Sequence, residues 1–317
     1  MSKEVPNLNE VRASSTRRLA DCGIDSAAID VDQLLMHVLG VEKAGLILAE
    51  LDHNQLDQFE VLLERRAQRE PLQHIIGKAY FRNLALEVGP GVFVPRPETE
   101  VLVDLALDLL PQAVAVAPTT PLGSVPTSIV DLCAGSGAIP LAVATELDLA
   151  SDSLTTPVTV YAVELDDASI EWTRRNTEVL KPTIPAGVQL KVVHADARTA
   201  ATEELARLRG QVSLVTCNPP YIPDAAIPRD PEVRDYDPEV ALYGGEDGLD
   251  IVRDIVRTAA DLLHPGGVLL IEHGDEQGDA GGELGVPHAV RAHGAFAQVE
   301  DHLDLTGRPR VTVAKRI

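Results

Sequence analysis

The first seventy residues carry apolar side chains at the spacing of amphipathic helices. Apolar residues recur every three or four positions within residues 30–40 and again within 56–70, and Asp or Asn residues stand near plausible helix starts. No alternating strand pattern interrupts residues 8–70. This part of the chain therefore predicts a small N-terminal helical bundle, which we assign to residues 1–75.

The pattern changes twice before residue 128. Residues 80–100 alternate apolar and polar positions on either side of a Gly-Pro-Gly triplet, which predicts a β-hairpin linker over residues 76–97. Residues 98–111 return to helical spacing. The stretch 115–128 is rich in Pro, Thr and Ala without either period, so we expect a flexible surface insertion there.

From residue 128 onward, short apolar runs alternate with helical segments. Strands separated by helices at this spacing imply right-handed crossovers and a parallel sheet covered on both faces. The expected strands span 128–133, 158–164, 188–195, 212–217 and 266–273, and the expected helices span 138–147, 168–180 and 248–263. We therefore expect an α/β domain over residues 98–317 with a Rossmann-like sheet, which binds ligands at the carboxyl ends of its strands.

Three of these strand ends carry residues suited to a nucleoside-bearing cofactor. Gly135 and Gly137 follow the first strand and let a ligand approach the backbone, and the next helix points its free N–H groups into the same space. Glu164 ends the second strand, where a carboxylate can accept hydrogen bonds from both ribose hydroxyls, and Asp196 follows the third. A tight structural turn and two solvated acids are the alternatives, but the shared sheet edge favours a cofactor site.

The fourth strand ends in the stretch Cys-Asn-Pro-Pro-Tyr. The prolines cannot continue a ladder, and Asn218 is held extended by the proline after it. The Asn218 side-chain oxygen and the Pro219 carbonyl are two convergent acceptors, which suits a planar NH₂ group and can aim its nitrogen at an electrophile. Tyr221 can lie flat against a planar amide or base. A structural turn would explain Pro219 and Pro220 equally well, but it gives no reason for the Asn and the Tyr.

We therefore interpret this stretch as a substrate clamp. Asn218, Pro219 and Tyr221 are expected to act in catalysis, and these three together with Pro220 are expected to bind the substrate.

Composition limits the setting of this chemistry. No apolar run is long enough to span a membrane, and the N-terminus lacks the apolar core of a signal peptide, so we expect a cytoplasmic protein with no membrane partner. The three cysteines and nine histidines show no disulfide or metal-ligand spacing, so we expect buried thiols and no metal. The net charge of −22 argues against a protein that binds nucleic acid by neutralising phosphates.

Several sequence blocks together resemble one family. The blocks "DLCAGSGAIPLA", "CNPPYIP", "EVALYGGEDGLD" and "PLQHIIGKAYFRNLALEVGPGVFVPRPETE" resemble the bacterial peptide chain release factor glutamine methyltransferases, the HemK-type enzymes. The likeness runs from about residue 10 to the C-terminus. Asn-Pro-Pro-Tyr is shared with adenine and cytosine amino-methyltransferases, whereas "PRPETE" and "GGEDGLD" are more specific to this family.

The resemblance implies a fold, a cofactor and a reaction. The fold is a seven-stranded class I methyltransferase sheet behind an N-terminal helical domain. The reaction transfers a methyl group from S-adenosylmethionine to the side-chain amide of the glutamine in the Gly-Gly-Gln motif of class I release factors, which leaves S-adenosylhomocysteine. The cofactor residues that the resemblance implies are Cys133, Ala134, Gly135, Ser136 and Gly137 for the methionine and ribose part, Glu164 for the ribose, Asp196 and Ala197 for the adenine region, and Asn218.

The chain departs from the usual family pattern at four of these positions. Cys133 and Ala134 stand where Gly and Thr are usual, Glu164 stands where Asp is usual, and Ala197 takes a place often held by an aromatic residue. No proton acceptor follows from the sequence, since Glu98 and Glu100 suit either that role or structural ion pairs.

The N-terminal bundle is expected to recognise the release factor. A basic cluster at its end supports this expectation, although a solvated helix end is an equal alternative; the cluster is Arg65, Arg66 and Arg69. Two other classes of function remain open. An adenine-specific nucleic-acid amino-methyltransferase would share residues 131–221, but the negative charge counts against it. A non-catalytic binding module would not need the Gly turn and Asn-Pro-Pro-Tyr.

Overall fold

The computed structural model describes residues 7–120, 123–124, 126–149 and 157–317. The chain divides into two compact units, which are described separately here. One unit comprises the residues up to Lys78 together with Pro228–Tyr236, and the other comprises Ala79–Ile227 and Asp237–Ile317. This division differs from the sequence-based boundaries because residues 79–97 of the predicted linker belong to the second unit, and the late segment Pro228–Tyr236 belongs to the first.

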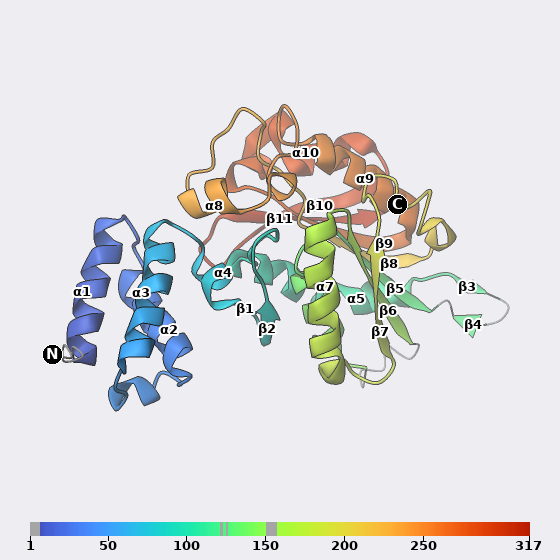
Figure 1. Cartoon of the computed structure of the whole chain (residues 1–317). Coiled ribbons are helices and arrows are strands. Elements are labelled where there is room, and N and C mark those ends of the chain that lie inside the picture. Colours follow the sequence, from blue (N-terminus) through green and yellow to red (C-terminus); the bar gives the residue numbers. More distant parts are fainter. Residues whose placement is uncertain (1–6, 121–122, 125, 150–156) are drawn as a thin grey trace. The chain divides into compact units, whose positions relative to one another are not determined.

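The first unit is the helical bundle that the sequence predicts. Its helices before Lys78 are α1 Leu8–Asp21, α2 Ala27–Leu39, α3 His53–Ala67 and α4 Leu72–Ile76 (Figure 1). Asn7 and Asp52 cap α1 and α3, and each forms a capping box with a Glu or Gln three residues later. The apolar faces meet in a buried core whose largest side chains are Leu19, Leu34, Leu35, Phe59 and Leu63.

Helix α8, Pro231–Tyr236, completes this unit through ion pairs. Glu232 accepts from Arg66 at 2.8 Å and from Arg69 at 2.6 Å, and Arg66 also pairs with Asp30 at 2.7 Å. The Arg66 side chain is only 7% exposed. These two arginines therefore hold a distant segment of the chain, which is neither the free basic cluster nor the solvated helix end expected from the sequence.

The second unit contains a seven-stranded sheet in the order β10-β11-β9-β8-β5-β6-β7 (Figure 1). The strands from β5 to β9 run parallel to their neighbours, and β11 and β10 continue the sheet in antiparallel register. The sheet strands are β5 Thr127–Leu132, β6 Val158–Glu164, β7 Val188–His194, β8 Val212–Cys217, β9 Leu263–Glu272, β10 Phe296–Leu303 and β11 Pro309–Arg316. The five parallel strands confirm the alternating pattern, whereas periodicity alone did not predict the antiparallel pair at the edge.

Two buried clusters lie on the two faces of this sheet. One joins the sheet to α9 and α10, and the other joins it to α5 and α6. The helices of this unit are α5 Glu100–Ala115, α6 Ala138–Glu146, α7 Asp167–Leu180, α9 Asp250–Leu262 and α10 Val286–His293. Strands β5 and β8 are buried along their whole length, as expected of central parallel strands. The sequence thus specified a doubly covered α/β sheet, and this part of the prediction is confirmed.

The β-hairpin before α5 turns at a different place from the one predicted. Its strands are β1 Lys78–Phe81 and β2 Leu84–Glu87, so the chain turns at residues 82–83. The Gly-Pro-Gly triplet instead packs on α7: a side chain on Gly89 would meet the Trp172 ring at 2.8 Å, and Ser169 donates to the Gly91 carbonyl at 3.1 Å. These glycines permit close packing and do not form the hairpin turn.

The expected insertion 115–128 also differs from its prediction where it is described. Helix α5 continues to Ala115 with Pro111 inside it, and β3 Thr119–Thr120 pairs with β4 Gly123–Ser124. Residues 121–122 and 125 lie outside the described part of the chain.

Candidate active site

The turn after β5 combines left-handed backbone with open space. Cys133, Gly135 and Gly137 have positive φ values of 69°, 57° and 86°. A side chain added at Gly137 would meet Thr173 of helix α7 at 3.2 Å, whereas one added at Gly135 would meet nothing within 4 Å. Gly137 therefore allows helix α6 to start close to α7, and Gly135 leaves room where a ligand can approach the backbone.

Glu164 at the end of β6 shapes this turn directly. Its carboxylate accepts from the backbone N–H groups of Gly135 at 2.7 Å and of Leu165 and Asp166 at 2.9 Å. Burial raises the pKa of Glu164, and these three hydrogen bonds oppose the shift. Since a carboxylate has about four acceptor sites, the backbone leaves room for about one further hydrogen bond to a ligand.

Helix α7 contributes two residues that the sequence analysis missed. Thr173 donates its hydroxyl to the Gly135 carbonyl at 2.6 Å. Asn176 donates to the Ser136 carbonyl and to the Glu87 carbonyl, both at 2.9 Å, and accepts from the Glu87 N–H at 2.7 Å. Both side chains are buried, so they fix the turn from behind. The sequence signal that could have identified them is that two polar residues stand on the otherwise inward-packing face of α7.

The third strand end offers a weaker match to its expected role. The Asp196 carboxylate is paired with the guanidinium of Arg198 at 2.6 Å, and this pairing lowers the pKa of Asp196. Ala197 is buried in the core beneath the sheet edge. A ligand hydrogen bond to Asp196 would have to share the carboxylate with Arg198.

The Asn-Pro-Pro-Tyr stretch lies beside the turn because its strand pairs with β5. Leu132 and Cys217 are register partners at the ends of their strands, so Cys133 and Asn218 are the first residues after two neighbouring strands. The backbone after Tyr221 is bound on both sides: Ile222 donates to Leu242 and Gly244 donates to Ile222, each at 2.9 Å.

The Gly-Gly-Glu-Asp-Gly segment, residues 244–248, lets its own backbone approach that of Pro220 and Tyr221. A side chain at Gly244 would lie 2.6 Å from the Pro220 carbonyl, and one at Gly248 would lie 2.4 Å from the Tyr221 carbonyl. Gln277 donates to the same Tyr221 carbonyl at 3.0 Å. The backbone of Pro220 and Tyr221 therefore packs closely against a loop more than twenty residues away in sequence.

A buried polar cluster adjoins Asn218. Cys217 and Ile271 are register partners, which places Glu272 one residue further along β9, next to Asn218. Burial raises the pKa of Glu272 to about 7, while Thr99, Arg310 and Asn218 lower it. Burial likewise raises the pKa of the half-buried Tyr221 to about 12, so its phenol stays neutral.

Three buried polar atoms of this cluster lack a hydrogen-bond partner within the described residues, namely Oε2 of Glu272, Oγ1 of Thr99 and Nε of Arg310. Thr99 nevertheless lowers the pKa of Glu272. The two candidate proton acceptors, Glu98 and Glu100, have different surroundings. Glu98 raises the pKa values of Glu272 and Tyr221, whereas Glu100 accepts from the Arg82 backbone N–H at 2.8 Å and serves the hairpin.

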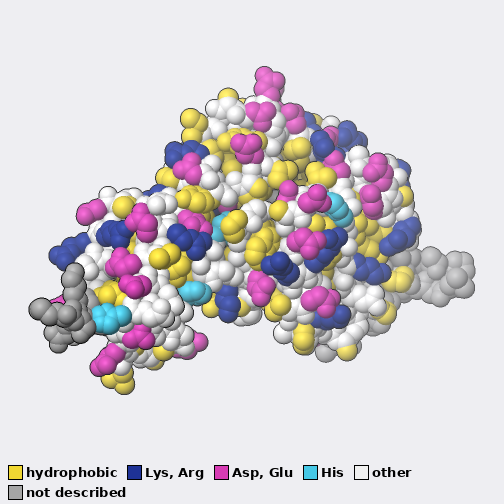
Figure 2. Space-filling view, viewed as in Figure 1, with side chains coloured by type: hydrophobic (Ala, Val, Ile, Leu, Met, Phe, Trp, Pro, Cys, Tyr) yellow, Lys and Arg dark blue, Asp and Glu magenta, His cyan; other side chains and the backbone are white. Residues whose placement is uncertain are grey.

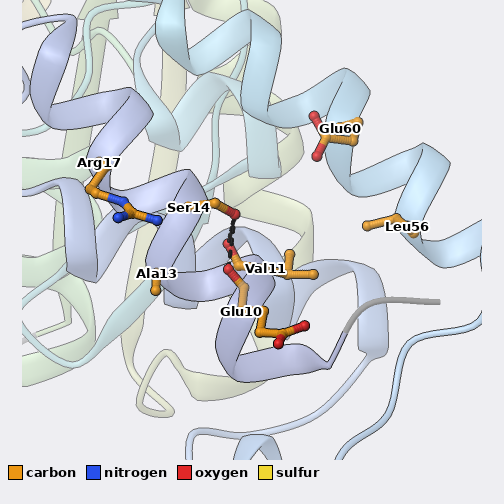
Figure 3. Close-up of a pocket in the computed structure, with 7 residues that line it drawn as sticks. All are labelled: Glu10, Val11, Ala13, Ser14, Arg17, Leu56 and Glu60. Atoms are coloured by element: carbon orange, nitrogen blue, oxygen red, sulfur yellow. Dashed lines mark hydrogen bonds between the residues drawn. The ribbon is translucent and has the colours of Figure 1, made fainter. Parts of the chain in front are cut away.

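A surface pocket of about 430 Å³ lies elsewhere, in the helical unit (Figure 3). It is lined by residues of α1 and α3, including Glu10, Arg17 and Glu60, and by none of the expected site residues. Its lining mixes charged and apolar side chains and contains neither a glycine-rich turn nor an Asn-Pro-Pro-Tyr stretch. We therefore do not assign it to the active site.

Other features of the described residues bear on the sequence expectations. The thiol of Cys217 is buried, that of Cys133 is half-buried and Cys22 is exposed, so the expectation of buried thiols is wrong for Cys22. No cluster of three His, Cys, Asp or Glu side chains suited to a metal occurs in the described ranges. No helix that the structure describes has the length and apolar content to cross a membrane. On the face drawn in Figure 2, basic side chains are interspersed with acidic ones.

Comparison with known proteins matches both the helical unit and the whole chain. Residues 10–77 match the family described as the PrmC N-terminal domain. The release factor glutamine methyltransferase of Streptomyces coelicolor is 43% identical, with 96% of each chain covered. The enzyme of the same name from Bifidobacterium longum is 44% identical over 97% of this chain and 99% of its own.

A third relative carries a different name. The 4-amino-L-phenylalanine/4-methylamino-L-phenylalanine methyltransferase of Streptomyces pristinaespiralis is 36% identical over 94% of this chain and 91% of its own. Similarity over the full length therefore includes at least two kinds of amino-group acceptor.

Proposed function

The chain belongs to the release factor glutamine methyltransferase family, and we propose that it methylates the side-chain amide nitrogen of the glutamine in the Gly-Gly-Gln motif of class I peptide chain release factors. The methyl donor is S-adenosylmethionine, whose sulfonium methyl group supplies the electrophile. The protein then has mainly to bring the acceptor nitrogen into line with that methyl group.

The cofactor residues fit such a donor in most respects. Open space at Gly135 lets a ligand approach the backbone, and Glu164 keeps acceptor capacity for a ribose hydroxyl. We assign the methionine and ribose part to residues 133–137 and Glu164. Asp196 and Ala197 remain our assignment for the adenine region, with Arg198 as a competitor for the Asp196 carboxylate.

One observation carries the proposed reaction: a rigid pair of acceptors stands directly beside that turn. Register pairing of Leu132 with Cys217 puts Asn218 and Pro219 at the neighbouring strand end, and the loop around Gly244 packs against the backbone of Pro220 and Tyr221, which follow them. Acceptors held in this way can bind both hydrogens of a primary amide and direct its nitrogen. No metal and no covalent intermediate are needed for this transfer.

A small aromatic amine is the second candidate acceptor, because one full-length relative is named for such a substrate. We favour the release factor because the relatives of higher identity carry that name. A protein acceptor also needs a binding surface, and we assign that role to the helical unit, whose residues 10–77 match the PrmC N-terminal domain. We further propose that the protein acts in the cytoplasm, where release factors are found.

An acceptor panel tests the proposal. Purified protein is incubated with S-adenosylmethionine labelled on its methyl group and with one of four acceptors: a class I release factor, the same factor with the motif glutamine changed to Ala, 4-amino-phenylalanine, or an adenine-containing oligonucleotide. We expect label only in the unmodified release factor. Label in the amino acid or the oligonucleotide, with none in the release factor, would overturn the assignment.

A further inference from the structure

The orientation of the Asn218 side chain decides whether the clamp can work. An Asn amide has an oxygen that accepts and an NH₂ group that donates, and the two ends are nearly equal in size. The proposed clamp requires the oxygen to face the substrate NH₂ group, because an NH₂ group in its place would confront another donor. Something must therefore hold the opposite end of the Asn218 amide.

Glu272 is the residue in position to do this. The residue is 2% exposed. It follows the register partner of Cys217, so it lies beside Asn218 at the neighbouring strand end, and its Oε2 atom has no hydrogen-bond partner among the described residues. Asn218 lowers the pKa of Glu272, as an N–H donor facing a carboxylate does, so the carboxylate can accept from the Asn218 NH₂ group. A carboxylate has no proton to offer the Asn218 oxygen, so it selects one of the two amide orientations.

We propose that Glu272 is a positioning residue that binds the NH₂ end of Asn218 and thereby turns the Asn218 oxygen toward the acceptor amide, an inference that rests on the proposed function. The Thr99 hydroxyl, which has no hydrogen-bond partner among the described residues, also lowers the pKa of Glu272, so the surroundings of Glu272 are polar although they are closed to solvent.

The proposal makes activity depend on the ionisation of Glu272. Burial raises its pKa to about 7; Arg310 on β11 lowers it, Glu98 before α5 raises it, and Tyr221, which follows Asn218, stays neutral. When Glu272 is protonated, its hydroxyl can donate to the Asn218 oxygen and the selection between orientations is lost. The rate of methyl transfer should therefore rise with pH through about 7.

Two substitutions separate this role from a structural one. In Glu272→Gln the side-chain oxygen can still accept from Asn218, and its NH₂ group has the Thr99 oxygen as an acceptor. This variant should keep kcat within about fivefold and lose the pH dependence near 7. In Glu272→Met no acceptor remains, and kcat should fall at least tenfold with unchanged affinity for S-adenosylmethionine.

A matched control uses another buried carboxylate of the same unit. Asp237 is buried beside Arg96, and burial raises its pKa to about 6. Asp237→Asn should leave the pH profile of kcat as in the parent protein. If this control flattens the profile as Glu272→Gln does, the dependence does not arise at Glu272.

A double-mutant cycle tests whether Glu272 acts through Asn218. Glu272→Met should cost little further activity in an Asn218→Ala background, measured in single turnovers with a release factor. Equal fold losses in the two backgrounds would overturn the proposal, because they would show that Glu272 acts independently.

A readout without acceptor keeps this test distinct from that of the proposed function. In protein labelled with ¹⁵N at Asn, the side-chain signal of Asn218, assigned by its loss in Asn218→Ala, should shift with a midpoint near pH 7 and stay fixed in Glu272→Gln. A signal that does not titrate in the parent protein overturns the inference even if the enzyme is active. A titrating signal in a protein that methylates no release factor would instead reject the proposed function.

Discussion

Removal of the Glu164 carboxylate should weaken both the fold and cofactor binding. The side chain accepts three backbone hydrogen bonds, from Gly135, Leu165 and Asp166, and it is only 8% exposed. A hydrogen bond to a charged group contributes about 1.5–3 kcal/mol, but removing the buried charge also recovers part of its desolvation cost. The three bonds sum to about 4.5–9 kcal/mol, and the recovered desolvation cost brings the net effect below that range, so we expect Glu164→Ala to lower the free energy of unfolding by about 3 kcal/mol.

Two measurements follow for this variant. For a large domain, about 3 kcal/mol corresponds to a fall in Tm of roughly 6–12 °C, measured by calorimetry. Affinity for S-adenosylmethionine, measured by titration calorimetry, should fall by at least about a hundredfold, because the turn loses its support as well as a ribose partner. Glu164→Gln, which keeps one acceptor oxygen, should fall between the parent protein and Glu164→Ala in both measurements.

A nearby glutamate provides the control. Glu171 on α7 is 59% exposed in its side chain, where it pairs with Arg174, so Glu171→Ala should change Tm by less than about 2 °C. If Glu164→Ala melts and binds the cofactor as the parent does, the three hydrogen bonds do not support the turn, and our reasoning about this carboxylate is refuted.

Three other substitutions test separate parts of the structure. Asn218→Ala should lower single-turnover kcat about a hundredfold or more with unchanged cofactor affinity, and Asn218→Asp should retain more activity; parental rates for Asn218→Ala would reject the clamp. Gly248→Ala would place a methyl group 2.4 Å from the Tyr221 carbonyl, so activity should fall at least tenfold. The control Gly210→Ala, whose methyl group would meet nothing within 4 Å, should only lower Tm slightly. Equal effects of the two substitutions would argue against close packing of the clamp. Because the pKa of Glu272 is raised from 4.5 to about 7, the folded state loses stability as pH rises through this range, by at most about 3 kcal/mol. Glu272→Gln should therefore raise Tm at pH 8 and not below pH 4.5. The same effect on Tm at both pH values would show that burial does not raise the pKa of Glu272.

The sequence predicted those parts of the site that depend on local pattern. The strand ends at Glu164 and Cys217 were readable because apolar runs stop at polar or proline residues there, and parallel strands place such ends along one edge. The hairpin turn was placed wrongly because glycines serve packing as well as turning. Gly89 makes room for Trp172, a contact between residues far apart in sequence that no local pattern reveals.

Residues that act through distant partners were not predicted. Glu272 stands at the end of an apolar strand, and the role that we propose for it depends on Asn218, which only the sheet register brings near. Arg66 looked like a free charge on an exposed helix, but its partners include Glu232, far along the chain. Burial of a charged group is decided by tertiary packing, so the sequence alone gives its type and position but not its partner.

The most direct test of the central claim is tandem mass spectrometry of a class I release factor after incubation with this protein and S-adenosylmethionine. We predict that the peptide with the Gly-Gly-Gln motif gains the mass of one methyl group, that fragmentation places it on the glutamine side chain, and that it is absent when Asn218→Ala replaces the parent protein. An unmodified motif glutamine after incubation with folded protein that binds the cofactor, or a methyl group on another residue, would contradict the account.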